Sequence, residues 1–254
     1  MIKKTLRWVG LVVAGLILIG LAVAWAFSEV RPDGVTGVAA NELANRMEQV
    51  LQVQAWEETG AVMWSFPGGH DHLWDKDRNL AKINWGENEV LVNLDTKEGV
   101  AFKKGKQLSG SDARDMVQKG WEYWVNDAFW LTAPFKAFDP GVQRSVVVTE
   151  AGDSSLLVSY KSGGDTPGDA YLWHFDEEGK PDSWKMWVSI IPIGGIKVPF
   201  DGWLETETGA ILPVSHSGLL SINLTGVKTA FELIEWFPNS DPFAPLLGGE
   251  AIGG

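Results

Sequence analysis

The second half of the chain, residues 142–231, consists of short segments in which apolar and polar residues alternate, with turn residues between them. Alternation with a period of two places successive side chains on opposite faces of a strand. Strands joined by such short turns favour antiparallel pairing. We predict strands over residues 142–149, 155–161, 170–176, 183–191, 198–207, 210–220 and 222–231.

One predicted hairpin, formed by residues 170–176 and 183–191, has a strongly apolar face. The expected cross-strand pairs are Phe175 with Trp184, Trp173 with Met186 and Tyr171 with Val188. Its other face is mixed and carries Leu172, His174, Lys185 and Trp187. This pattern is typical of a sheet with one apolar and one largely solvated face.

Two amphipathic segments predict helices. Residues 38–52 gather Met47 and Leu51 on one face, and residues 111–125 do the same with Trp121. In the second helix we expect Ser111 as the N-cap, Asp112 in the first turn and an end near Asn126 and Asp127. The stretch that follows, residues 128–138, is apolar enough to plug a core or line the mouth of a cavity.

The first half also contains strand patterns, at residues 81–85, 90–94 and 99–103. Counting all segments gives about ten antiparallel strands with two helices. We therefore predict a mainly β (α+β) fold, a curved antiparallel half-barrel over residues 38–237 with the two helices as a lid. Residues 31–37 are interpreted as a linker and residues 238–254, rich in Pro and Gly, as an irregular tail.

The N-terminal residues 1–30 predict export. Residues 8–27 contain no charge and follow Lys3, Lys4 and Arg7. This run is long enough to span a bilayer as a helix, with the basic end in the cytoplasm. Two interpretations remain open: an uncleaved inner-membrane anchor, or a signal peptide cleaved after Ala26 that leaves a periplasmic protein. Both place the domain outside the cytoplasm.

Composition limits the partners. Without Lys3, Lys4 and Arg7, 18 basic residues face 33 acidic ones, a formal charge of −15. Nucleic acid is therefore not an expected partner, because it is bound by clustered Lys and Arg. The chain has no cysteine, which excludes disulfides, a lipid-modified thiol and thiol catalysis.

Tryptophan is unusually frequent, with 14 residues of which twelve lie after the leader. Indole rings bury large apolar areas and suit a wide sheet or a ligand groove. We expect a hydrophobic small molecule or acyl chain as the ligand, with no cofactor. The candidate ligand-binding residues are Trp64, Trp85, Trp121, Trp124, Trp130, Trp173, Trp184 and Met186.

Three motifs contain residue types that can carry chemistry. His70 and His72 would point to the same side of an extended segment, where Asp75, Asp77, His174 or His216 could complete a metal site. No H-E-x-x-H motif accompanies them, so a polar turn before a strand is the favoured interpretation and no metal site is predicted. The carboxylates Asp127 and Asp139 are assigned to capping and turns, and residues 162–169 to a structural turn.

Several fragments carry a family resemblance. They are His72–Leu73–Trp74–Asp75, Asn126–Asp127–Ala128–Phe129–Trp130–Leu131 with Pro134, and Thr166–Pro167–Gly168–Asp169 with Tyr171. In these fragments and in the order of its elements, the chain resembles a group of uncharacterised bacterial envelope proteins that are similar in architecture to the lipoprotein carriers of the Lol system. The resemblance implies an incomplete, curved barrel that holds acyl chains on its concave side, with Trp173, Trp184 and Met186 as lining.

Three functions follow as hypotheses. The leading one is a non-enzymatic protein that binds a lipid or acyl chain in a concave half-barrel. The second is a structural or interaction module of the cell envelope whose interior is filled by its own side chains. The third, a metal-dependent hydrolase, would be built around His70 and His72.

Overall fold

The computed structural model describes residues 26–149, 152–161, 168–219 and 221–248, together with the single positions Trp8, Gly15 and Gly20. Most of the predicted membrane segment 8–27 and most of the turn 162–169 lie outside the described residues. Among the helices of the described part, none is both long and apolar enough to cross a membrane.

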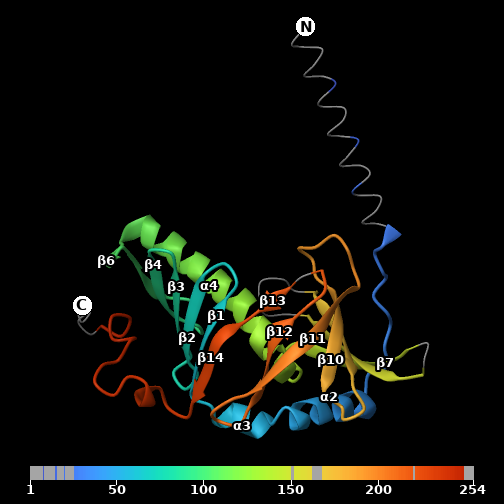
Figure 1. The fold of residues 1–254 in the computed structure, drawn as a ribbon. Coiled ribbons are helices and arrows are strands. Elements are labelled where there is room, and N and C mark those ends of the chain that lie inside the picture. The colour runs from blue at the N-terminus through green and yellow to red at the C-terminus, as the bar shows by residue number, and fades with distance from the viewer. Residues whose placement is uncertain are drawn as a thin grey trace.

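Two antiparallel sheets of seven strands each make up most of the fold (Figure 1). The first sheet has the order β14-β1-β2-β3-β4-β5-β6 and the second the order β13-β12-β11-β10-β9-β8-β7. The first contains β1 (Ala61–Phe66), β2 (His70–Asp75), β3 (Leu80–Trp85), β4 (Asn88–Asn93), β5 (Gly99–Lys103), β6 (Lys106–Gln107) and β14 (Thr225–Ala230). The second contains β7 (Val142–Val148), β8 (Ser154–Tyr160), β9 (Ala170–Phe175), β10 (Pro181–Trp187), β11 (Ile196–Glu205), β12 (Ile211–His216) and β13 (Ile222–Asn223). The prediction of a mainly β, antiparallel fold is confirmed, and neither sheet closes on itself.

A single extended segment, residues 222–230, joins the two sheets. Its first part is β13, which pairs with β12, and its second part is β14, which pairs with β1. Between them the Leu224 amide donates a hydrogen bond to the carbonyl oxygen of Val214 at 2.8 Å. The chain therefore passes from one sheet to the other without a loop.

The first predicted helix is present with a break. It forms α2 (Val38–Val50) and a short second helix, α3 (Val53–Glu58). Gln52 lies between them in the left-handed region, with φ 60°, which ends the first helix. Met47 and Leu51 are fully buried as expected, and α2 packs against β7 and β8.

The second predicted helix is longer than expected. α4 (Gly110–Thr132) has Ser109, not Ser111, at its N-cap and does not end at Asp127, so both of those predictions were wrong. The helix continues past Asp127 because Ala128 and Leu131 of the next turn are buried against the first sheet. The apolar stretch 128–138 therefore supplies the last turn of α4 and the short 3-10 helix η1 (Ala133–Lys136).

α4 touches both sheets. It packs against β3, β4 and β5 of the first sheet and against β12 of the second, and it runs diagonally past the strands in Figure 1. Val117 and Trp121 of α4 contact the apolar side chains of β3 and β4. This position puts the C-terminal half of α4 beside both apolar sheet faces.

The predicted register of β9 and β10 was wrong by two residues. Trp184 pairs with Trp173, and Met186 pairs with Tyr171. The turn is tighter than expected, since the Asp176 amide bonds to the Lys180 carbonyl at 2.9 Å and the second strand already begins at Pro181. A shift of two residues keeps each side chain on its face, so the predicted apolar face remains and forms a buried cluster.

The first sheet is covered on both sides. Val90 and Val92 of β4 face α4, whereas Leu91 faces the C-terminal segment. Residues 238–248 form no helix or strand, but Phe243 in this segment is fully buried against Leu91 and its neighbours. A strand that is buried on both faces has a continuous apolar sequence, as the Val90–Val92 run of β4 does.

Candidate functional site

A cavity of about 810 Å³ lies beside α4 and is named here the α4 cavity. Its wall combines residues of α4, of the first sheet and of the second sheet. The aromatic members of the lining are Phe66, Trp74, Trp121, Trp124, Phe129, Trp130, Tyr160, Tyr171 and Trp184. Aliphatic side chains, among them Met186, Val188 and Ile191, complete most of the rest.

The wall is held by ring contacts between α4 and the second sheet. Phe129 lies 4.9 Å from Tyr171, and Trp130 lies 5.4 Å from Trp184, measured between ring centroids. Burial raises the pKa of both Tyr160 and Tyr171, so their hydroxyls stay neutral at physiological pH. The second-sheet wall is therefore mainly apolar, with Asp169 beside Tyr171 as a carboxyl group in the lining.

Polar groups are confined to a few positions of the cavity. Lys136 and Asp139 line it and form an ion pair with each other at 2.5 Å. Ile190, which also lines it, is 74 % exposed, so the cavity opens to solvent. This combination of an apolar wall, few polar groups and an opening is typical of small-molecule sites.

Of the eight predicted ligand-binding residues, five line the cavity: Trp121, Trp124, Trp130, Trp184 and Met186. The other three are not part of the wall. Trp173 packs edge-on against Trp184 at 4.9 Å, Trp64 stacks on His72 at 4.6 Å, and Trp85 contacts Tyr123 at 5.3 Å.

Other lining residues were not predicted. Tyr160 and Tyr171 lie on β8 and β9, and strand alternation places Tyr171 on the same face as Trp173, which was available as a signal. Phe66 and Trp74 could not be found in this way, because β1 and β2 were not predicted. Trp74 belongs to β2, which begins at His70, in the segment interpreted as a polar turn.

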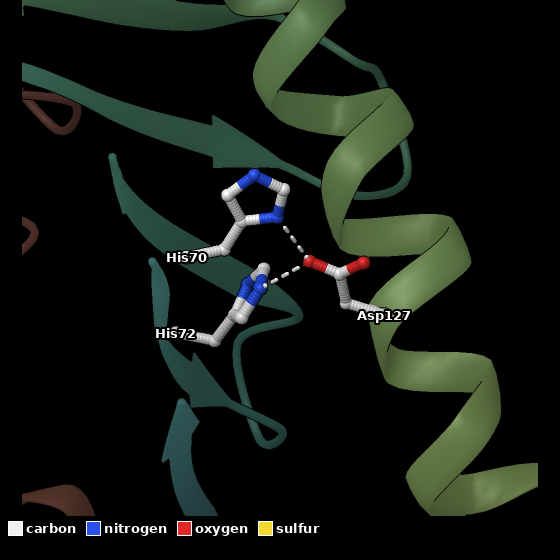
Figure 2. Close-up of side chains that lie close together, drawn as sticks. All are labelled: His70, His72 and Asp127. Carbon is white, nitrogen blue, oxygen red and sulfur yellow. Dashed lines mark hydrogen bonds and ion pairs between the residues drawn. The ribbon is translucent and has the colours of Figure 1, made fainter. Parts of the chain in front are cut away.

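Next to the cavity, two histidines of β2 meet one carboxylate of α4 (Figure 2). His70 Nδ1 and His72 Nε2 each lie 2.8 Å from Asp127 Oδ2. Residues two apart on a strand point to one face, which brings both rings toward the helix. We call these three residues the His–Asp cluster.

The His–Asp cluster is almost completely enclosed. The exposed fractions of the side chains are 15 % for His70, 0 % for His72 and 1 % for Asp127. The Asn126 side chain donates to Asp127 Oδ1 at 2.9 Å, and the Tyr123 ring stacks on His70 at 3.9 Å. Burial lowers the pKa of His72, while its hydrogen bond to Asp127 opposes that effect.

The tautomer of His72 follows from its partners. Its Nε2 faces the Asp127 carboxylate, which only accepts hydrogen bonds when ionised, so Nε2 carries the proton in a neutral ring. Its Nδ1 is buried and has no hydrogen-bond partner among the described residues. An unpaired acceptor is less unfavourable there than an unpaired N–H would be.

None of the four residues that could have completed a metal site joins His70 and His72. Asp75 accepts a hydrogen bond from Arg78 at 2.6 Å, and His174 bonds to Ser155 at 2.9 Å. His216 donates from Nε2 to the Trp130 carbonyl at 3.1 Å, and burial lowers the pKa of His216 to about 4. The group of histidine and acidic side chains that could share a metal ion contains His70, His72 and Asp127, without Asp77.

The structure does not bring Asp127 and Asp139 together as a carboxylate pair. Asp139 bonds to Lys136, and Asp127 bonds to the histidines. No sequence signal links Asp127 to His72, which is 55 positions away on another element. The contact depends on the packing of α4 against the first sheet.

No protein-family model matches the chain, and no curated protein matches it either. A fold of this kind does not define a function by itself, since function depends on the groups in a site. The α4 cavity and the His–Asp cluster are therefore the two features that inform the functional argument.

Proposed function

We propose that the protein binds an apolar ligand, such as a lipid or an acyl chain, in the α4 cavity and that it is not an enzyme. The cavity itself carries the proposal. Its volume of about 810 Å³ falls in the range of about 300–1,000 Å³ that is typical of small-molecule sites. Its lining is mainly aromatic and aliphatic.

The architecture supports this proposal. We interpret the two sheets as one strongly curved half-barrel that continues through residues 222–230, with α4 and α2 as its covering helices. The hydrogen bond at Leu224 and the packing of α4 on both sheets favour this interpretation. The resemblance to the lipoprotein carriers of the Lol system is consistent with acyl chains as the cargo.

The energetics are sufficient without a specific polar contact. Transfer of an acyl chain from water contributes about 0.8 kcal/mol per methylene, so about ten buried methylenes contribute about 8 kcal/mol. Before the cost of ordering the chain, this corresponds to a Kd of about 1 μM. Phe129, Trp130 and Val188 line the cavity and are partly exposed, so they offer an apolar surface of the required kind.

The size of the cavity favours ligand binding over a purely structural module. A module that only presents its outer surface to partners would fill its interior with its own side chains, to the density of a packed core. We also propose that the domain acts outside the cytoplasm, held by residues 8–27 or released by cleavage after Ala26.

The proposal is tested by titrating delipidated protein with oleate and following tryptophan fluorescence. We expect saturable binding, because the cavity wall contains Trp121, Trp124, Trp130 and Trp184. Val188→Trp fills the lined space and should weaken binding by more than about tenfold. Val148→Trp is the matched control, since Val148 is 67 % exposed on β7 and should leave affinity unchanged.

Two results would contradict the proposal. One is the absence of any fluorescence change with oleate, with a lysolipid and with a lipopeptide. The other is equal affinity in the Val188→Trp variant and the wild type, provided that the variant unfolds at a similar temperature.

A further inference from the structure

We propose that His70, His72 and Asp127 form a binding site for one divalent transition-metal ion. The proposal is independent of ligand binding in the α4 cavity. It rests on the ligand geometry, the burial and the charge of the His–Asp cluster, all of which come from side chains on two rigid elements.

The geometry needs little change to accept an ion. All three ligand atoms lie within 4.8 Å of one another, and both nitrogen-to-oxygen distances are 2.8 Å. A metal ion bound at about 2.0–2.2 Å from each atom in a tetrahedral site holds adjacent ligand atoms about 3.3–3.6 Å apart. The two nitrogen-to-oxygen pairs would therefore have to open by about 0.5–0.8 Å to admit an ion.

The ligand set is suitable when His72 binds the ion as its Nδ1–H tautomer, which moves the ring proton from Nε2 to the unpaired Nδ1. Two imidazole nitrogens and one carboxylate oxygen bind zinc and iron(II) and leave further positions for water or a substrate. Imidazole favours these ions over magnesium or calcium, which prefer oxygen ligands. A divalent first-row transition ion is thus the chemical class that the site would take.

The charge of Asp127 is a second, independent argument. Its side chain is 1 % exposed, and among the described residues no lysine or arginine forms an ion pair with it. Buried charges in proteins are normally paired with an opposite charge or bound to a metal. The Asn126 amide supplies a hydrogen bond, and an imidazole supplies an opposite charge only when it is protonated, whereas a divalent ion would supply that charge with both rings neutral.

The surroundings hold the ligands in place. β2 is an internal strand between β1 and β3, so the backbones of His70 and His72 are fixed on both sides. The second oxygen of Asp127 is bonded to Asn126, and the Trp64 ring stacks on His72. His70 is the exposed member, at 15 %, and marks the side from which an ion would enter.

The test uses the full chain, freed of metal by dialysis against a chelator. Calorimetric titration with Zn²⁺ should show one ion bound per chain, and Co²⁺ should give visible absorption bands of a nitrogen- and oxygen-ligated ion. Asp127→Asn and His70→Asn should each weaken Zn²⁺ binding by more than about tenfold. His174→Asn is the control, because His174 lies outside the cluster and bonds to Ser155.

The proposal is overturned if Zn²⁺ shows no saturable binding below about 100 μM. It is equally overturned if Asp127→Asn and His70→Asn bind Zn²⁺ as the wild type does, which would assign the cluster to fastening α4 on β2. Should Asp127→Asn fail to fold, His70→Asn at the more exposed position decides the question by itself. Oleate titration of the same variants separates this outcome from that of the α4 cavity.

Discussion

Glu48 on α2 is a single side chain whose protonation should affect stability. Burial raises the pKa of Glu48 to about 7, and Glu57 nearby adds to the effect. Because the folded pKa lies above the unfolded value of 4.5, the folded protein binds more protons between about pH 4.5 and 7, and its stability falls as the pH rises through that window.

The variant Glu48→Gln should therefore be more stable than the wild type at pH 8 and similar to it at pH 4. After a discount for solvent screening, the gain at pH 8 is about 1 kcal/mol, or about 2–4 °C in Tm. Thermal unfolding at both pH values measures it. Glu42→Gln on the exposed face of α2 serves as the control, and an equal gain at both pH values would show that the charge of Glu48 is not the cause.

The residues of the His–Asp cluster show how far sequence reasoning reaches at this scale. A period of two correctly places His70 and His72 on one side of an extended segment. It does not identify their partner, since Asp127 follows the α4 pattern and was assigned to the end of a helix. The chemistry of a buried carboxylate depends on what packs over it, and that is a tertiary property.

At the scale of elements, α4 approaches the first sheet closely at one glycine. A Cβ added to Gly120 would lie 2.9 Å from Val90 of β4, which is shorter than normal contact. Gly120 is buried in the middle of the helix, so a larger residue must push α4 away from the strand.

We predict that Gly120→Ala destabilises the protein by about 1–3 kcal/mol through this overpacking. Helix propensity alone predicts the opposite, a gain of about 1 kcal/mol from Gly to Ala. Urea unfolding distinguishes the two effects, with Lys119→Ala on the exposed side of α4 as the control. Stabilisation by Gly120→Ala would mean that α4 and β4 are less closely packed than described here.

Elements were predicted better than their ends and their pairing. The strands of the second sheet were found because each alternates, and the register between β9 and β10 was missed because it depends on the turn at Asp176–Lys180. β1 and β2 were not predicted because their sequences mix histidine, aspartate and serine with aromatic residues. The alternation in them is less clear, although Trp64, His72 and Trp74 follow it.

At the scale of the whole molecule, the C-terminal segment completes the core of the first sheet. Phe243 is fully buried with Leu73, Leu80, Leu91 and Phe102, on the face opposite α4. Arg78 adds a bidentate contact to Asp241 at 2.6 and 3.0 Å, which holds the segment beside the turn after β2.

Phe243→Ala should lower the free energy of unfolding by about 3–5 kcal/mol, as expected for a fully buried aromatic side chain. Chemical denaturation measures this loss. Leu247→Ala in the same segment is the control, because Leu247 is 57 % exposed and its removal should cost little. A small effect at Phe243 would indicate that the segment leaves the sheet easily in solution.

The fold class could be predicted from the sequence, but the arrangement of the two sheets and of α4 could not. Alternation and turn spacing predict many antiparallel strands, and amphipathic patterns predict the helices that cover them. Nothing in these patterns shows that residues 222–230 serve both sheets or that α4 touches both. Such pairings join residues that are far apart in the sequence, so local patterns do not predict them.

The segment 222–230, which pairs with both sheets, determines how the protein should respond to truncation. A cut that separates the halves leaves either β12 or β1 with a bare backbone edge, because β13 covers the one and β14 the other. Bare edges recruit strands from other molecules. Shortened versions of this chain that lack residues 222–230 should consequently self-associate through the freed edges of β12 and β1.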